Sequence, residues 1–248
     1  VVLSSAVGSA NPIDSFQIQS AQDVTLAAVT VDGAAGSNTI DLGVASVIDG
    51  TITLNGDLST AGAASADTGH LRVNSSGAVN LAATVTLNTA NASGNNSGNI
   101  TVLGGGTLQS ATPWVQGVTF DADEGGVGTD GAVDLSNITL TNLDHLEVEA
   151  ASLTFADLTV GDGVNNPGDA GTGLKVTTSG NFTLSGDISA AGDTVTNNAG
   201  NVTLNVNGSD GNIILSSGGA SDATTVSITT DASGTDGAIT LGAIEDGA

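Results

Sequence analysis

The chain has 248 residues, including 36 glycines but no cysteine, methionine or tyrosine, and its 26 acidic residues face only two basic ones, Arg72 and Lys175. The formal net charge of −24 at pH 7 excludes nucleic acid and anionic lipid as partners, because such a surface repels both. The lack of cysteine excludes disulfides and thiol catalysis, and no apolar run approaches the ~18 to 20 residues of a membrane-spanning helix, so no membrane insertion is expected.

Short apolar–polar–apolar triplets recur along the chain, and each predicts a strand that buries one face. They begin at residues 24, 52, 79, 133, 182, 202 and 239. Several continue through a bend into a second apolar pair, as at 24–31, 79–87 and 133–140. The best helix candidate, 143–153, alternates apolar and polar residues and therefore also predicts a strand. Clusters of Gly, Asn, Asp and Ser predict the turns, so the chain is predicted to be all-β.

Two phrases occur twice and indicate an internal repeat. ITLNGDLSTAG at 52–62 returns as FTLSGDISAAG at 182–192, and GTDGAVDLSNI at 128–138 returns as GTDGAITLGAI at 234–244. The two offsets, 130 and 106 residues, divide into units of about 21 residues, a period typical of solenoids. Such a unit cannot bury its own apolar face, whereas stacked copies can. The sequence therefore predicts a parallel β-helix of about eleven or twelve coils.

A β-sandwich is the alternative fold, since it is also built from short alternating strands. Sandwiches usually need large residues to fill the space between two sheets, and this chain has only four phenylalanines and one tryptophan. The β-helix is therefore favoured. We expect residues 1–248 to form a single rod segment of a longer chain or filament, with loop insertions near 111–130 and 161–173.

Four stretches carry a resemblance to a known family. They read DGTITLNGDLSTAG from 49, NSGNITVLGGGTL from 96, SGNFTLSGDISAAG from 179 and AGNVTLNV from 199. They resemble the coils of filamentous-haemagglutinin-like adhesins and the related large bacterial β-strand-repeat surface proteins. The resemblance implies a right-handed parallel β-helix inside a large exported protein that serves in adhesion or as a stalk. It carries over no binding-site residue.

Catalytic residues are hard to assemble from this sequence. Polysaccharide-cleaving β-helices need a base with cations, or paired carboxylates in a cleft, and Arg72 and Lys175 are the only fixed cations. His70 and His145 stand apart from any spacing typical of a Ser–His–Asp site. We therefore expect no enzyme, and a polysaccharide-cleaving activity is the least favoured function.

One acidic segment is a candidate calcium site. DADEGGVGTD brings together Asp121, Asp123, Glu124 and Asp130, and carboxylate oxygens are the ligands that calcium prefers. GGVGTDGAV at 125–133 also matches the start of the calcium-binding nonapeptide of β-rolls, but those sites need tandem copies and only one occurs here. A glycine-rich turn is the alternative interpretation. Calcium is the only cofactor that the sequence suggests.

The function predicted from these features is an extracellular structural and adhesive rod at a bacterial cell surface. The expected partners are further coils, from the same chain or from a second copy stacked head to tail, and a host or neighbouring cell surface. Trp114, the only tryptophan, is expected to pack a loop against a coil. The alternative function is a calcium- or glycan-binding surface module.

Overall fold

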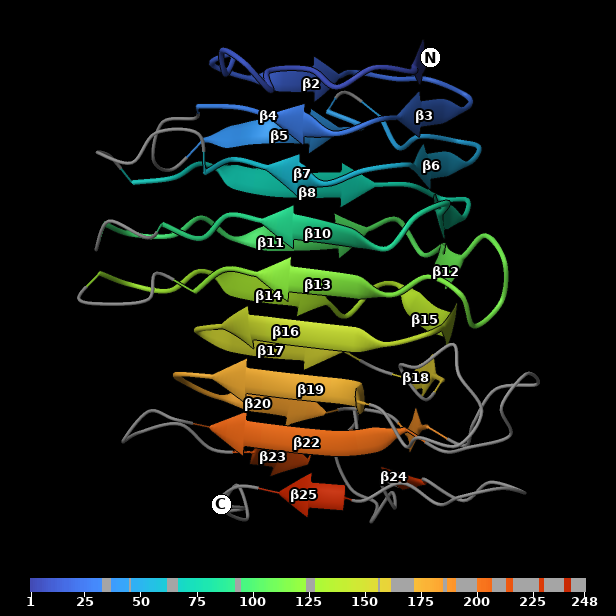
Figure 1. Cartoon of the computed structure of the whole chain (residues 1–248), viewed down its shortest axis with the longest axis vertical. Coiled ribbons are helices and arrows are strands. Elements are labelled where there is room, and N and C mark those ends of the chain that lie inside the picture. The colour runs from blue at the N-terminus through green and yellow to red at the C-terminus, as the bar shows by residue number, and fades with distance from the viewer. Residues whose placement is uncertain are drawn as a thin grey trace.

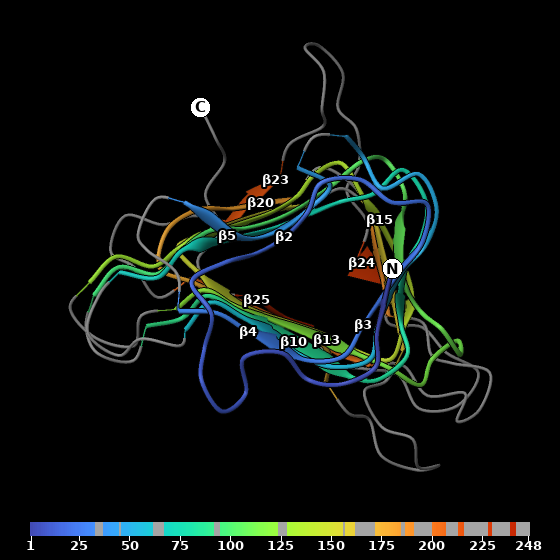
Figure 2. The same ribbon diagram turned by 90° about the horizontal axis from the view of Figure 1, so that it is seen from above.

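The chain forms an all-β coil with three faces, seen from the side and from above in Figures 1 and 2. A computed structural model describes residues 1–32, 37–44, 46–61, 67–91, 95–123, 128–155, 157–161, 172–184, 187–190, 200–206, 213–215, 228–229 and 239–241. Within these residues there is no helix, and every pairing between the named strands is parallel. Each face of the coil is one sheet that runs along the long axis.

The three sheets contain nine, eight and eight strands among the described residues. Sheet A contains β1 (Val2–Leu3), β3 (Val24–Leu26), β6 (Ile52–Leu54), β9 (Val79–Leu81), β12 (Thr107–Ser110), β15 (Thr139–Leu143), β18 (Leu158–Val160), β21 (Ile188–Ser189) and β24 (Ile228–Thr229). Sheet B contains β4 (Val29–Thr30), β7 (Leu58–Ser59), β10 (Val85–Asn88), β13 (Val118–Asp121), β16 (Leu146–Ala150), β19 (Thr172–Thr178), β22 (Asn201–Val206) and β25 (Ile239–Leu241). Sheet C contains β2 (Phe16–Ile18), β5 (Asn38–Leu42), β8 (His70–Asn74), β11 (Ile100–Leu103), β14 (Ala132–Leu135), β17 (Ser152–Phe155), β20 (Phe182–Leu184) and β23 (Ile213–Leu215).

The coil is a right-handed parallel β-helix, so the predicted fold class is confirmed. In Figure 2, which looks down from the N-terminal end, the chain runs clockwise from β3 through β4 to β5 as it moves away from the viewer. One circuit therefore visits sheets A, B and C in turn, and the next circuit repeats that order. A β-sandwich is excluded, because a sandwich is built from two antiparallel sheets.

The predicted coil of about 21 residues is wrong, because the coils take about 29 residues. Where the corners are tight, a coil is short: Val133 pairs with Leu153, 20 residues further on. Where a loop projects at a corner, the coil lengthens, and Ile100 pairs with Val133 after 33 residues. The predicted period therefore describes a coil without loops. For the same reason the sheets have eight or nine strands in the described part of the chain, rather than the eleven or twelve that the shorter period predicts.

The repeated phrases lie in different sheets, which explains why their offsets do not measure whole coils. The phrase at 52–62 contains β6 of sheet A, but its copy at 182–192 contains β20 of sheet C. The phrase at 128–138 contains β14 of sheet C, and its copy contains β25 of sheet B. All three sheets need the same local pattern of apolar positions around a bend. The phrase therefore predicts a strand but does not predict which of the three sheets that strand joins.

The core is a set of columns formed by inward side chains of successive coils. In sheet A, Val24 pairs with Ile52 and Ile52 with Val79, and each side chain is no more than 1% exposed. Larger side chains occur in the later coils, where the rings of Phe155 in β17 and Phe182 in β20 lie 5.5 Å apart between centroids. The interior is therefore narrow and filled mainly by Val, Ile and Leu, as the composition predicts.

Both basic residues are used in ion pairs on the outside of the coil. On sheet C the Arg72 guanidinium donates from Nε to Asp41 Oδ1 at 2.8 Å and from Nη2 to Asp41 Oδ2 at 2.7 Å. The Asp41 side chain is only 3% exposed, although it points away from the core. This two-bond contact joins the second and third strands of sheet C.

We expect Arg72→Ala to destabilise the fold by about 3 kcal/mol, because it leaves the buried Asp41 carboxylate unpaired. Urea unfolding followed by circular dichroism measures the loss. The double variant Asp41→Asn with Arg72→Ala should recover part of it, since the uncompensated charge is then gone. Equal loss in the single and double variants would show that the pair contributes only through packing of the arginine stem.

Asp and Asn side chains at the corners connect successive coils. The backbone N–H of Thr86 donates to Asp57 Oδ1 at 2.7 Å, and that of Ala132 to Asn99 Oδ1 at 2.9 Å. The same contact joins Thr51 to Asp23 at 2.9 Å and Asp187 to Asp157 at 3.0 Å. In each case the acceptor belongs to one coil and the donor to the next, so the predicted placement of Asp in turns has a structural use.

Removing one of these acceptors should cost about 1 kcal/mol. Asp57→Ala leaves the Thr86 N–H without its partner, whereas Asp57→Asn keeps an oxygen at the same position. In urea unfolding, the free energy of unfolding of Asp57→Asn should therefore be close to that of the wild type, and that of Asp57→Ala should be lower than both. Equal stability of Asp57→Ala and Asp57→Asn would show that the hydrogen bond contributes nothing measurable.

Candidate functional site

Loops of equal length project from three consecutive coils at the corner between sheets B and C. Each runs between residues nine positions apart, and a hydrogen bond closes its neck. The closing bonds run from Thr60 Oγ1 to Gly69 O at 2.8 Å, from Thr89 Oγ1 to Gly98 O at 2.6 Å and from the Gly131 amide to Ala122 O at 2.8 Å. Because the threonine hydroxyls are buried, these bonds fix the direction in which each loop leaves the coil.

Hydrogen bonds join the described residues of these three loops, and we call these residues the loop ridge: 61, 67–68, 90–91, 95–97, 123 and 128–130. Asn96 donates from its amide N to Asp67 Oδ1 at 2.8 Å and from Nδ2 to Asp67 Oδ2 at 3.1 Å. Its own Oδ1 accepts the N–H of Thr129 at 3.0 Å. The chain of Asp67, Asn96 and Thr129 thus links the described parts of all three loops into one raised edge. The side chains of Asp67 and Asn96 are thus engaged within the ridge.

The calcium candidates lie at the two ends of the third loop. Asp121 ends β13, and its Oδ1 accepts the N–H of Asp123 at 3.3 Å. Asp130 accepts a hydrogen bond from the Ser179 hydroxyl, two coils away in the sequence. Glu124 lies outside the described residues. In the part of the chain that the structure describes, no three His, Asp or Glu side chains converge to hold a metal ion. The calcium site therefore stays a prediction.

Sequence reasoning missed an acidic strip on the outer face of sheet B. In the sheet Asp121 pairs with Glu149, and Glu147 pairs with Lys175. The Lys175 ammonium donates to Glu147 Oε1 and, at 3.3 Å, to Glu149 Oε1. The alternation LEVEA at 146–150 contained the signal, because it places both glutamates outward. Only the register of β13 against β16 shows that Asp121 lies beside Glu149 in this strip.

The strip changes the ionisation of Asp121 and Lys175. Burial raises the pKa of Asp121 above its ordinary 3.8, as do the nearby Glu149, Asp123 and Glu147 carboxylates, while the backbone hydrogen bond from Asp123 opposes this. The hydrogen bond to Glu147 raises the pKa of Lys175 above 10.5, so the ammonium stays charged at neutral pH. In this strip the ionised form of Asp121 is therefore destabilised, and the protonated form of Lys175 is stabilised.

We expect Asp121→Asn to stabilise the protein at pH 7, because a raised pKa means that folding disfavours the ionised form. The cost of the charge is present above the raised pKa and is relieved as the pH falls towards 3.8, so the advantage of the variant should shrink over that range. Thermal unfolding between pH 7 and pH 4 measures it.

Asp134→Asn is the matched control for this experiment. Asp134 faces outward on sheet C, and its register partners are Thr101 and Thr154, neither of which is charged. It should give no comparable pH-dependent gain. A gain of equal size in Asp134→Asn would mean that the effect comes from total net charge and not from the strip.

The Trp114 loop and His145 lie at one corner, between sheets A and B, whereas His70 begins β8 of sheet C. His70 Nδ1 accepts the N–H of Asn99 at 2.8 Å, so this ring serves as an inter-coil acceptor. His145 Nδ1 lies 2.9 Å from Oδ2 of the buried Asp144. The Trp114 amide donates to Asn142 O at 2.9 Å, which attaches the loop 111–117 to the next coil. The predicted insertion at 111–130 thus contains β13 between two projecting segments, whereas residues 162–171 of the second insertion lie outside the described residues.

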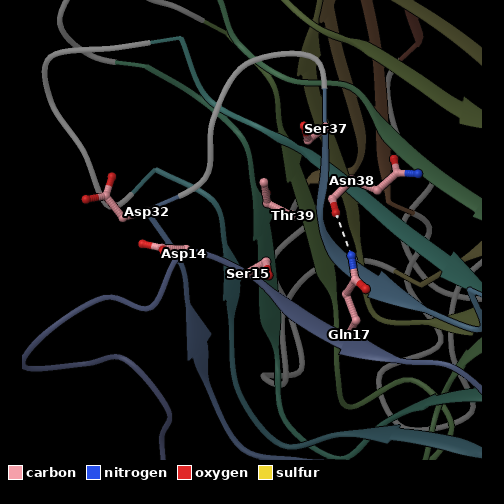
Figure 3. Close-up of a pocket in the computed structure, with 7 residues that line it drawn as sticks. All are labelled: Asp14, Ser15, Gln17, Asp32, Ser37, Asn38 and Thr39. Carbon is pink, nitrogen blue, oxygen red and sulfur yellow. Dashed lines mark hydrogen bonds between the residues drawn. The ribbon is translucent and has the colours of Figure 1, made fainter.

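A polar groove lies between the first two coils, on the sheet C side (Figure 3). It has a volume of about 420 Å³. Its lining residues are all polar and are Asp14, Ser15, Gln17, Asp32, Ser37, Asn38 and Thr39. Sequence reasoning missed this groove, because its two coils become neighbours through the pairing of β2 with β5 and the bridge between Ile13 and Val31.

Comparisons with family models, with curated proteins and with solved structures find no match to this chain. The described residues also contain no helix that is long and apolar enough to cross a membrane. The β-solenoid architecture is therefore the basis for assigning a class, and the chain is a β-helix repeat protein.

Proposed function

We propose that this chain is a structural rod of a bacterial cell-surface protein or fibre, and that it serves in adhesion outside the cell. The observation that carries the proposal is the stacking of similar coils around one apolar core that runs through the described coils. Such a coil resists bending and separates two points in space, which is the task of a stalk. The resemblance of its coil phrases to filamentous-haemagglutinin-like adhesins favours the same function.

The two ends of the described coil favour further coils as partners. At one end Val1 and Val2 are 56% and 72% exposed, and at the other Ile239 and Leu241 are 45% and 41% exposed. These apolar side chains accompany strand edges that have no neighbour among the described residues. Unpaired parallel edges beside apolar side chains are favourable places for another coil to add. We propose that further coils, from the same polypeptide or from a second copy, cover these edges.

The strongly acidic surface of the rod favours an extracellular location and disfavours side-by-side association with other rods. Its net charge is −24 and, in the described part, both cations are already engaged by carboxylates. Rods of this charge repel one another side by side, while the apolar side chains at the ends leave end-to-end contact as the favoured association. Adhesive contact is then made by corner segments such as the loop ridge.

Electron microscopy of native material tests the proposal. Antibody raised against residues 1–248 should label extended fibres on intact cells, and the label should lie along their shafts. Labelling that appears only after the cells are broken, or compact particles without a shaft, would contradict it.

Light scattering on the purified chain distinguishes whether a second copy or further coils of the same polypeptide cover the end strands. Head-to-tail stacking of copies predicts a mass that grows with concentration and falls to that of a monomer in Val2→Asp, which places a charge in the apolar contact. Continuation of the same polypeptide predicts a monomer at all concentrations. Association that persists in Val2→Asp and increases with salt would indicate lateral contact instead, and would contradict the proposed polarity of assembly.

A further inference from the structure

We infer that the polar groove between the first two coils binds a neutral saccharide through its hydroxyl groups. The groove's volume of about 420 Å³ falls within the ~300 to 1,000 Å³ of small-ligand sites. The inference names a ligand class for the adhesive part of the proposed function and rests on that function only for its biological meaning. The binding itself follows from the chemistry of the lining.

Hydrogen-bonding groups of every kind that a sugar needs line the groove. The carboxylates of Asp14 and Asp32 accept hydrogen bonds, and the amides of Gln17 and Asn38 both donate and accept them. The hydroxyl of Ser15 adds a further donor and acceptor. A sugar ring presents neighbouring hydroxyls that also donate and accept, so one ring can satisfy several of these groups at once. Figure 3 shows Asp14 and Asp32 on one side of the groove and Gln17 and Asn38 on the other.

Other ligand classes fit the groove less well. An anion would meet two carboxylates, and Arg72, which follows Gln17 and Asp41 in the same column of sheet C, already gives two donors to Asp41. No apolar side chain lines the groove, so an apolar ligand would leave its carboxylates and amides without hydrogen-bond partners. A metal ion would find two carboxylates but no third His, Asp or Glu side chain among the described residues to complete a cluster.

The groove is held in shape before any ligand arrives. The two coils that line it are joined by the pairing of β2 with β5, and the Gln17 Nε2 donates to Asn38 O at 3.5 Å. Thr39 is only 3% exposed, and its hydroxyl lies 3.4 Å from His70 O of the next coil. A preformed site loses less conformational entropy on binding. Since the lining has no aromatic platform, the expected Kd is about millimolar.

Saturation-transfer NMR and calorimetry on the purified chain test the inference with a panel of neutral mono- and disaccharides. We expect at least one to bind, and we expect Asp32→Ala and Gln17→Ala each to raise its Kd by about tenfold. Asp49→Ala is the matched control, because Asp49 is an exposed carboxylate outside the groove, and it should leave the Kd unchanged. Circular dichroism verifies that all three variants keep the fold.

Three results would overturn the inference. They are the absence of binding by any neutral saccharide, an equal loss of binding in Asp49→Ala, and binding of uronates or calcium at the groove in place of neutral sugars. None of them would affect the fibres expected in electron microscopy, so failure of the saccharide site and failure of the proposed rod are distinguishable.

Discussion

Every part of this molecule depends on the parallel pairing of each coil with the one before it. A strand must place its apolar residues over those of its neighbour, as Val24, Ile52 and Val79 do in sheet A, because a shift by one residue would turn them outward. Long insertions are therefore accommodated at corners, whereas the ladders themselves contain small register shifts, as between Asn38 and Ile40 and between Leu140 and Leu143. This constraint explains why coils of 20 and 33 residues coexist in one sheet. It also explains why the loop ridge lies at a corner, whereas the acidic strip lies on the face of sheet B.

Acidic residues have two different roles under this constraint. At corners such as Asp57 and Asp23, the carboxylate accepts a backbone N–H of the following coil and helps to hold the stack together. On a flat sheet face they stack above one another, and Asp121 and Glu149 then lie side by side at an electrostatic cost. Lys175 reduces that cost within the strip. Some of the acidic residues thus stabilise the stack by accepting hydrogen bonds, whereas others destabilise it by mutual repulsion, and together their charge makes separate rods repel one another.

Because loops leave the coil at its corners, residues that could contact a ligand are separate from the core columns that hold the coils together. The neck bonds made by Thr60 and Thr89 let loops leave the coil without disturbing the columns inside it. The loop ridge satisfies much of its own hydrogen bonding, as Asn96 does with Asp67 and Thr129, and so offers a defined shape more than free ligand groups. The polar groove differs, because its carboxylates and amides face an open volume. The ridge thus offers a defined shape, and the groove, at the same corner one coil earlier, offers hydrogen-bonding groups. Together they suit a rod that also makes contacts.

The sequence by itself determined the fold class, the inward residues and the use of Asp in turns, because these follow from local alternation and turn chemistry. It did not determine the coil length, since β6 and β20 carry the same phrase but lie in sheets A and C, and local pattern does not distinguish three equivalent faces. Nor could it place Asp121 beside Glu149, or β2 beside β5 around the groove. Only the tertiary structure decided these, because the number of residues in each corner sets which side chains become neighbours one coil later.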